Sequence, residues 1–368
     1  TSVKKIKQEY EQKVLTMHMT LEALEETQKE IFRGDAATMG RVDVYLPCER
    51  PQSYYRWALM TGGAKRDGFV VARMLSDIVS WPGEKGRQRE DKHCIQPGTY
   101  CGLLFMFSAR DGMPAALIND GYLQHMRVAG GAGLGVKYLA REDSQVVGMI
   151  GSVVMSRTYL EAFAAVRKIT KVKVYSTNPA NARQYAKEMG EKFHIEIEPV
   201  GSAREAAKGV DIVSCCTSSI DPVFKTAWLE PGMHVTDVTW DETEPGFVRS
   251  VDVAIKMGES TPHLENPAPG TFYAAHGFLG YVAGQPEERA IIPRRPPREE
   301  ILKMPTLAEL IGGKVKGRTD AKQTTWFLNL GVMGVQFAAV CAAVYHEAKK
   351  RGIGREIPTE WFTQSIRD

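Results

Sequence analysis

The stretch from Gln145 to Arg167 limits most strongly what this chain of 368 residues can fold into. Its apolar start, Val146 to Ile150, predicts a short buried strand, and Gly151 breaks the apolar pattern. From Ser156 onward the apolar residues recur at helical spacing. A strand, a tight glycine turn and a helix form the usual cradle for the pyrophosphate of a dinucleotide, because the start of the helix offers unpaired N–H groups and a partial positive charge.

The glycine pattern of this turn is incomplete. A G-x-G-x-x-G motif requires glycine at positions 151, 153 and 156, whereas the chain has Gly151, Val153 and Ser156. Valine at position 153 brings a branched side chain to a place where pyrophosphate normally meets bare backbone, and a β-branched residue disfavours a positive φ. The strand and helix periodicity on either side of this turn still predicts the fold. Whether the turn binds a cofactor tightly is left open.

Strands and helices alternate after this turn. Further strand patterns run over 171–176, 195–200, 211–216, 232–238 and 251–255. Alternation of this kind predicts an α/β fold with a doubly wound parallel sheet and right-handed crossovers. The chain before His125 differs, because a helical pattern is followed by strand patterns separated by Pro, Gly and Asp, which predicts an α+β segment with an antiparallel meander.

Composition excludes several classes of partner and site. The net charge of +3 is small for this length, so we expect neither nucleic acid nor a membrane surface as a partner. No apolar run reaches the roughly 18 residues that span a bilayer, and the charged first residues lack the apolar core of a signal peptide, so we expect a cytoplasmic protein. The six cysteines show no metal-binding spacing, so we expect reduced thiols and no metal.

Ligands of open α/β sheets lie beyond the carboxyl ends of the strands, so the residues that follow each strand are candidates. Ser176, Thr177 and Asn178 follow the second strand and include no carboxylate for the ribose 2′-OH of NAD, which slightly favours NADP over NAD. The hydroxyl-rich turn that begins at Cys216 either borders the cofactor or is ordinary turn chemistry.

A few charged residues are candidates for chemistry. Asp241 follows a strand end and is either a proton donor and acceptor or a turn cap. Arg127, within a helix of small residues, binds either a carboxylate or phosphate or an ion-pair partner. Arg73 is flanked by apolar residues, so its burial requires an anion, either a side chain such as Asp77 or a substrate; Arg41 lies in the same strand region.

An ordered series of segments resembles the ornithine cyclodeaminase/mu-crystallin family over nearly the whole chain. The series is GRVDVYLP, GFVVARMLSD, HMRVAGGAGLGVKYLA, GMIGSVVMSRTYLEAF, DIVSCCTSSIDPVF, LEPGMHVTDVTWDE and GREIPTEWF. The resemblance implies a discontinuous substrate-binding and dimerisation domain over 1–125 and 325–368, and a Rossmann-like dinucleotide-binding domain over 126–324. It also implies a homodimer that acts on a small carboxylate substrate.

The resemblance also implies roles for individual residues. Arg41 and Arg127 match the arginines that bind the substrate carboxylate, and Asp241 matches the acid/base aspartate. Arg73 falls where the family often has lysine; it keeps the charge but cannot act as a base, and Lys65 is the neighbouring substitute. The residues expected around the cofactor are Gly151, Ser152, Val153, Val154, Met155, Ser156, Ser176, Thr177, Asn178, Cys216, Thr217, Ser218, Val238 and Trp240.

The leading hypothesis is an oxidoreductase that uses NAD or NADP to interconvert a small amino acid and its imine or 2-oxo acid by hydride transfer at the α-carbon. The second hypothesis is a cyclodeaminase-type ammonia lyase with no net redox change. The third is a binding protein that has lost efficient cofactor use, which the valine pair at positions 153 and 154 favours.

Overall fold

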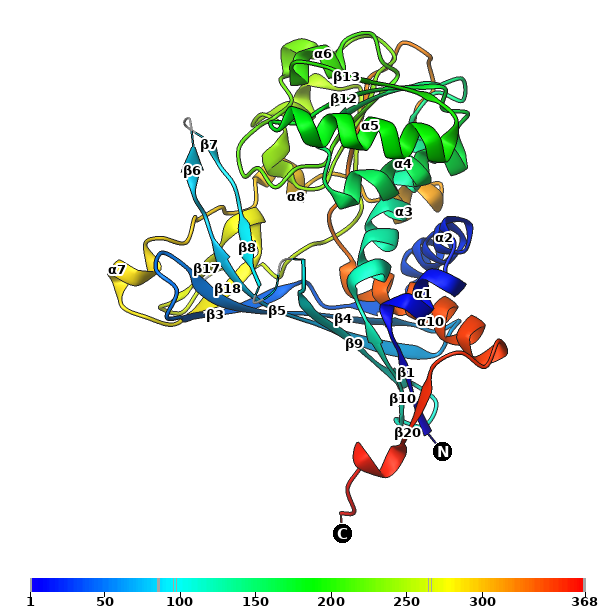
Figure 1. Cartoon of the computed structure of the whole chain (residues 1–368), viewed down its shortest axis with the longest axis vertical. Coiled ribbons are helices and arrows are strands. Elements are labelled where there is room, and N and C mark those ends of the chain that lie inside the picture. The colour runs from blue at the N-terminus through cyan, green and yellow to red at the C-terminus, as the bar shows by residue number, and fades with distance from the viewer. Residues whose placement is uncertain are drawn as a thin grey trace.

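The computed structural model describes residues 2–84, 87–94, 96, 98–263, 265 and 267–366, with the backbone alone of residue 84. Two sheets build two lobes (Figure 1): a parallel sheet with its helices in the upper lobe, and a broad, mainly antiparallel sheet in the lower lobe. Among the described residues, no helix combines the length and the hydropathy that a bilayer crossing requires.

The upper sheet has the strand order β13-β12-β11-β14-β15-β19-β16, and every neighbouring pair is parallel. The strands are β11 (Val146–Ile150), β12 (Lys171–Tyr175), β13 (Glu196–Pro199), β14 (Ile212–Cys215), β15 (His234–Asp237), β16 (Val253–Lys256) and β19 (Thr325–Leu328). Successive strands leave β11 first on one side and then on the other, so the order reverses between β11 and β14. The predicted α/β fold class with a Rossmann-like doubly wound parallel sheet is confirmed.

The lower sheet has the order β17-β18-β3-β4-β5-β9-β10-β1-β20, with β2 on β4 and β8 on β5. Its strands are β1 (Ser2–Ile6), β2 (Ala36–Thr38), β3 (Val42–Pro47), β4 (Tyr54–Ala64), β5 (Phe69–Ser80), β8 (Asp91–His93), β9 (Cys101–Ser108), β10 (Pro114–Asn119), β17 (Thr271–Tyr273), β18 (Leu279–Val282) and β20 (Arg355–Pro358). A small hairpin, β6 (Gly83–Glu84) with β7 (Arg87–Gln88), rises from this sheet toward the upper lobe (Figure 1).

Helices connect these strands. The α-helices are α1 (Gln8–Val14), α2 (Met17–Arg33), α3 (Gly121–Leu139), α4 (Val154–Val166), α5 (Pro179–Phe193), α6 (Ala203–Ala207), α7 (Pro286–Arg289), α8 (Glu299–Leu302), α9 (Leu307–Ile311) and α10 (Met333–Lys350). The 3-10 turns are η1 (Thr226–Trp228), η2 (Trp240–Glu242), η3 (Phe247–Ser250), η4 (Ala275–Gly277) and η5 (Thr359–Trp361).

Helices cover only one face of the lower sheet. On β4 and β5, buried residues alternate with half-buried ones, which is the pattern of a sheet with one covered face. Helix α10 lies directly on β4, since a Cβ on Gly334 would stand 2.0 Å from the backbone oxygen of Thr61. Figure 1 shows no α-helix on the opposite face, which carries Trp57, Leu59 and Phe105. The ring of Phe362, directly after η5, lies 5.7 Å from that of Phe105.

The two sheets divide the chain differently from the expected domain boundaries. Strands β17 and β18 lie within 126–324, yet β18 pairs with β3 in the lower sheet. Strand β19 begins at Thr325, and it pairs with β15 and β16 in the parallel sheet. The chain therefore leaves the upper lobe after β16, contributes a hairpin to the lower sheet, and returns to complete the parallel sheet.

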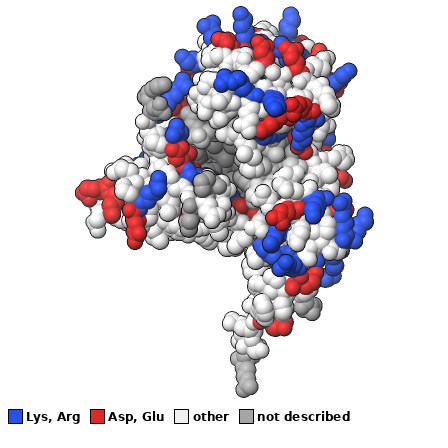
Figure 2. All heavy atoms as spheres, viewed as in Figure 1, with Lys and Arg blue, Asp and Glu red and all other residues white. Residues whose placement is uncertain are grey.

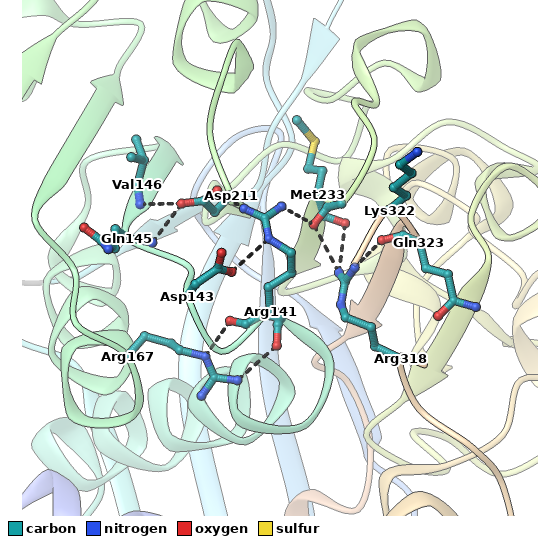
Figure 3. A network of polar contacts seen from close by, with 12 residues as sticks. Arg141, Asp143, Gln145, Val146, Arg167, Asp211, Met233, Arg318, Lys322 and Gln323 are labelled. Atoms are coloured by element: carbon teal, nitrogen blue, oxygen red, sulfur yellow. Dashed lines mark hydrogen bonds and ion pairs between the residues drawn. The ribbon is translucent and has the colours of Figure 1, made fainter. Parts of the chain in front are cut away.

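Arginines tie α3 to the edge of the parallel sheet where the strands begin (Figure 3). Arg167 donates a hydrogen bond to Arg141 O at 2.8 Å (Figure 3). It also donates to backbone oxygens at the end of α3, including Val136 O and Ala140 O at 3.0 Å each. Arg141 contacts Asp211 at 2.5 Å, and Asp211 in turn accepts from the N–H of Val146 at 2.9 Å. These bonds satisfy carbonyls that a helix end leaves open, and they lie opposite the edge that carries Gly151.

Candidate active site

Gly151 is fixed by the strands that meet at the carboxyl edge of the parallel sheet. Its φ is +110°, and a Cβ at this position would lie 2.1 Å from the backbone oxygen of Cys216. Its N–H donates to Tyr175 O at 2.9 Å. Only glycine accommodates this conformation and this close approach, so the first position of the predicted cradle is built as expected.

Valine at position 153 has an ordinary backbone. Its φ is −72° and its ψ is 173°, so the positive φ that valine disfavours is not required there. Val153 and Val154 are exposed residues, at 49% and 59% of their accessible surface. Together with Ser152, Arg157 and residues of α5 they line an open pocket of about 490 Å³, so their methyl groups border this space.

The first turn of α4 fits an anion. No side chain caps this helix. The N–H groups of Val154 and Met155 have no hydrogen-bond partner among the described residues, whereas the N–H of Ser156 donates to Val153 O at 3.1 Å. Free N–H groups at a helix start, directly after a glycine turn, are the donors that a pyrophosphate uses. The hydroxyl of Ser156 itself is buried and donates to Val153 O at 2.6 Å, so it holds the turn.

The expected ribose contacts lie at the end of β12 and mainly hold the turn into α5. Asn178 caps α5 by accepting from Ala180 N at 3.0 Å, and Ser176 accepts from Asn178 N at 3.3 Å. Thr177 lies between them. No carboxylate occupies these positions.

A buried carboxyl group holds together the loops that follow β14 and β15. Glu242 accepts hydrogen bonds from both N and Oγ1 of Thr217 at 2.8 Å, and from Val238 N at 2.8 Å. Burial raises the pKa of Glu242, although these hydrogen bonds oppose the shift. Cys216 and Trp240 are buried beside this clamp. The nearby backbone oxygen of residue 218 accepts from the N–H of Glu90, which comes from the lower lobe.

Two of the predicted arginines are paired with carboxylates on the covered face of the lower sheet. Arg41 donates to both oxygens of Asp43, at 2.7 and 3.0 Å, and lies 4.1 Å from the centre of the Phe278 ring. Arg73 is buried and donates to Asp120 at 2.7 Å. Burial lowers the pKa of Arg73, and the charge of Arg41 lowers it further, which shows that the two cations are near each other.

Asp77 is not the partner of Arg73. It pairs instead with Arg56, whose Nε and Nη2 donate to the two oxygens of Asp77 at 2.9 and 2.7 Å. Arg56 also donates to Glu90 at 2.9 Å. The reason is strand register: Arg56 stands directly opposite Asp77 on β4 and β5.

Arg127 differs from the other arginines, since no carboxylate among the described residues neutralises it. Its guanidinium is held by the side-chain oxygens of Gln124 and Gln336, each at 2.9 Å, and lies 4.6 Å from the centre of the Phe337 ring. Burial and the charge of Arg73 lower its pKa to about 9. A guanidinium that is held in place and has no anionic partner can bind a carboxylate.

Lys65 does not reach this cluster, which overturns its expected role as a neighbouring base. Its side chain is 79% exposed and pairs with Asp35 at 3.4 Å on the surface. The lysine that does face the arginines is Lys92 on β8, 3.8 Å from Asp77. Partial desolvation and the charges of Arg56 and Arg73 lower the pKa of Lys92.

Asp241 lies buried in η2 at the end of β15, facing the lower lobe. Its Oδ2 is 3.2 Å from Nδ1 of His276, which comes from the turn η4 between β17 and β18. Arg298 is also close to Asp241. Burial lowers the pKa of Arg298, and the negative charge of Asp241 opposes this shift. The space-filling view shows the surface hollowed between the two lobes (Figure 2).

Sequence reasoning missed His276, Lys92 and the Arg56–Asp77–Glu90 group. His276 stands in an A-A-H-G-F segment whose glycine marks a turn, but no local pattern brings this turn to Asp241. Arg56 and Asp77 could have been found from strand register. Both lie in strands that the sequence predicts, and they stand opposite each other when β4 and β5 pair.

Comparisons with known proteins agree with this arrangement. An alanine dehydrogenase of Archaeoglobus fulgidus is 28% identical over 261 residues, covering 70% of this chain and 74% of the relative. The structure of Thermococcus litoralis Delta(1)-pyrroline-2-carboxylate reductase in complex with NADH and L-proline has a TM-score of 0.74 at 24% identity, covering 96% of this chain and all of the other. An archaeal alanine dehydrogenase dimer with bound NAD has a TM-score of 0.73 at 22% identity, covering 97% and 99%.

A family model identifies the chain directly. The match covers residues 88–352, which is most of the chain and includes the glycine turn, Arg127, Asp241 and His276. The protein belongs to the ornithine cyclodeaminase/mu-crystallin family.

Proposed function

We propose that this protein is a nicotinamide-dependent oxidoreductase that interconverts a small α-amino acid and its imine or 2-oxo acid. The observation that carries the proposal is Arg127, a buried guanidinium that is held by two amides and forms no ion pair with a carboxylate among the described residues. It stands close to Arg73 and Arg41. A substrate α-carboxylate supplies the anion that this group lacks, and the bound geometry presents the α-carbon for reaction.

The cofactor fits the first turn of α4. When bound, a nicotinamide dinucleotide supplies or accepts the hydride. Gly151 and the free N–H groups of Val154 and Met155 would hold its pyrophosphate, and Val153 borders the same pocket. The absence of a carboxylate at Ser176–Asn178 favours NADP over NAD. The related alanine dehydrogenase and pyrroline-2-carboxylate reductase support the choice of reaction class.

Proton transfer is assigned to the Asp241–His276 pair. The pair combines a carboxylate and an imidazole at hydrogen-bond distance, which is the usual composition of an acid/base centre near neutral pH. It is buried between the lobes, so water is largely excluded from it.

The uncovered face of the lower sheet supports a homodimer. This face carries Trp57, Leu59 and Phe105, which are half-buried in the single chain. A contiguous apolar face of this kind marks an interface in a globular protein. The archaeal alanine dehydrogenase of similar fold is a dimer.

The test is a turnover assay with NADPH or NADH and cyclic imino acids, or 2-oxo acids with ammonia. We expect the reduced cofactor to be oxidised only when a cyclic imino acid, or a 2-oxo acid together with ammonia, is present. Ammonia release from a diamino acid without net change in the reduced cofactor would replace the proposal by cyclodeaminase chemistry. Substrate binding with no reaction and no cofactor binding would replace it by a binding protein.

A further inference from the structure

The turn that carries His276 is built under strain. His276 has φ +60° and ψ 13°, a left-handed conformation that is uncommon among non-glycine residues. The next residue, Gly277, also has positive φ, and a Cβ there would lie 1.7 Å from Cζ2 of Trp240. The turn η4 is therefore pressed against η2, the segment that contains Asp241. Strain at a single non-glycine residue persists where surrounding contacts over-determine it, as at functional sites.

The imidazole is oriented with one nitrogen engaged and the other open. Nδ1 faces Asp241 at 3.2 Å, and because a carboxylate only accepts, Nδ1 carries the hydrogen. Nε2 has no hydrogen-bond partner among the described residues, and the side chain is 14% exposed. The ring is thus held by its Nδ1 while its Nε2 remains free for another group.

The turn that carries this open nitrogen lies beside the arginines proposed to bind the substrate. Strand β18 pairs in parallel with β3, with Leu279 opposite Val42, so the turn before β18 lies beside Arg41. The Arg41 guanidinium stacks on Phe278, two residues after His276. Glu90 is also near, since the charges of Arg56 and His276 hold its pKa well below the usual range against the effect of burial. Two carboxylates, Asp241 and Glu90, therefore lie close to the imidazole of His276.

We propose that His276 is the catalytic residue that exchanges a proton with the substrate nitrogen, and that Asp241 is the positioning residue that orients its ring. This inference rests on the proposed function, because it names which member of the pair touches substrate. In the reducing direction, the Nε2–H bond breaks and its electron pair stays on the ring. The proton forms an N–H bond with the lone pair of the imine nitrogen, while the hydride forms the Cα–H bond. Solvent then reprotonates the imidazole.

Two variants of His276 separate this role from a structural one. In His276→Asn the side-chain amide can still donate to Asp241, and asparagine tolerates positive φ, but it carries no exchangeable imidazole proton. His276→Gly relieves the strained backbone and leaves room for imidazole added to the buffer. We expect kcat to fall about 100- to 1000-fold in both variants with cofactor affinity unchanged, and imidazole to restore the glycine variant with saturation.

The control is His194, which ends α5 with φ +55° on the surface far from the pair. His194→Asn and His194→Gly should leave turnover unchanged, with or without imidazole. A second readout needs no turnover: ¹⁵N NMR of labelled histidines should show the hydrogen of neutral His276 on Nδ1, and Asp241→Ala should abolish that preference.

The possible outcomes separate the role of His276 from the proposed function. Wild-type turnover in His276→Asn, a glycine variant that imidazole fails to restore, or a hydrogen on Nε2 with bare Nδ1 would overturn the role of His276 and leave the proposed function standing. A wild-type protein that binds a cofactor and an amino acid yet transfers no hydride would overturn both.

Discussion

At the residue scale, the arginines of the site differ in what neutralises them. Arg73 and Arg41 each have a carboxylate, whereas Arg127 has only two amides. Removal of Arg127 therefore strands no buried charge, while removal of Arg73 would leave Asp120 unpaired. Substitution of Arg127 is therefore expected to impair substrate binding, whereas substitution of Arg73 is expected to lower the stability of the protein.

We expect Arg127→Met to raise the KM for the amino or imino acid by roughly 10- to 100-fold, which corresponds to the loss of a charged hydrogen bond, with little change in Tm. Arg73→Met should instead lower Tm by several degrees. Steady-state kinetics and thermal unfolding of both variants measure this contrast. An unchanged KM in Arg127→Met would remove the guanidinium from substrate binding.

Single residues were predictable where local chemistry constrains them and not where tertiary contacts do. The sequence pointed to Gly151 because a strand–turn–helix requires it there, and to Asp241 because it follows a strand. It misassigned Lys65, because a lysine beside a strand end can equally well face solvent. For Arg73 it left the anion open between a side chain, such as Asp77, and a substrate. Register with the neighbouring strands decided the actual pairs.

At the element scale, α1 is anchored on the start of α3 by a buried acid. Glu11 is fully buried and accepts from Leu123 N at 3.2 Å, in the first turn of α3. Burial raises its pKa from the ordinary value to about 8, against the effect of this hydrogen bond, and Asp120 adds to the rise. The folded protein therefore holds a proton that the unfolded chain releases above pH ~4.5.

This raised pKa predicts how stability depends on pH. Between about pH 4.5 and 8 the folded state binds more protons at Glu11 than the unfolded state, so the contribution of Glu11 to stability falls as pH rises, by on the order of 5 kcal/mol in total. Glu11→Gln keeps an acceptor and removes the titration. Its free energy of unfolding, relative to wild type, should rise between pH 5 and pH 8. A difference that is constant with pH would contradict the raised pKa.

The strand patterns of the upper lobe were predictable because each buried parallel strand is a short apolar run bounded by turn residues. The hairpin of β17 and β18 was not, since its strands are short and its pairing with β3 joins segments more than 200 residues apart. Strand β8 also escaped prediction, although it carries Lys92 to the arginines.

At the scale of the whole molecule, the site lies between two lobes, and the uncovered face of the lower sheet points away from it (Figure 1). Trp57 stands near the middle of that face on β4. We expect Trp57→Glu to weaken the proposed dimer by at least about 100-fold, because a buried aromatic anchor is lost and a charge is desolvated. Sedimentation velocity across a concentration series measures this.

The control for Trp57→Glu is Leu302→Glu on α8, an exposed position away from this sheet, which should leave the oligomeric state unchanged. A wild-type protein that stays monomeric at all concentrations would contradict the proposed interface.

We propose that the turn between β11 and α4 binds a nicotinamide dinucleotide although valine stands there in place of a glycine of the motif. Titration with NADPH and with NADH, followed by nicotinamide fluorescence, tests it most directly. We expect saturable binding of at least one cofactor, tighter binding in Val153→Gly, and loss of binding in Gly151→Ala, whose Cβ would collide with the backbone of Cys216. Absence of binding to either cofactor at millimolar concentrations, in wild type and in Val153→Gly alike, would contradict it.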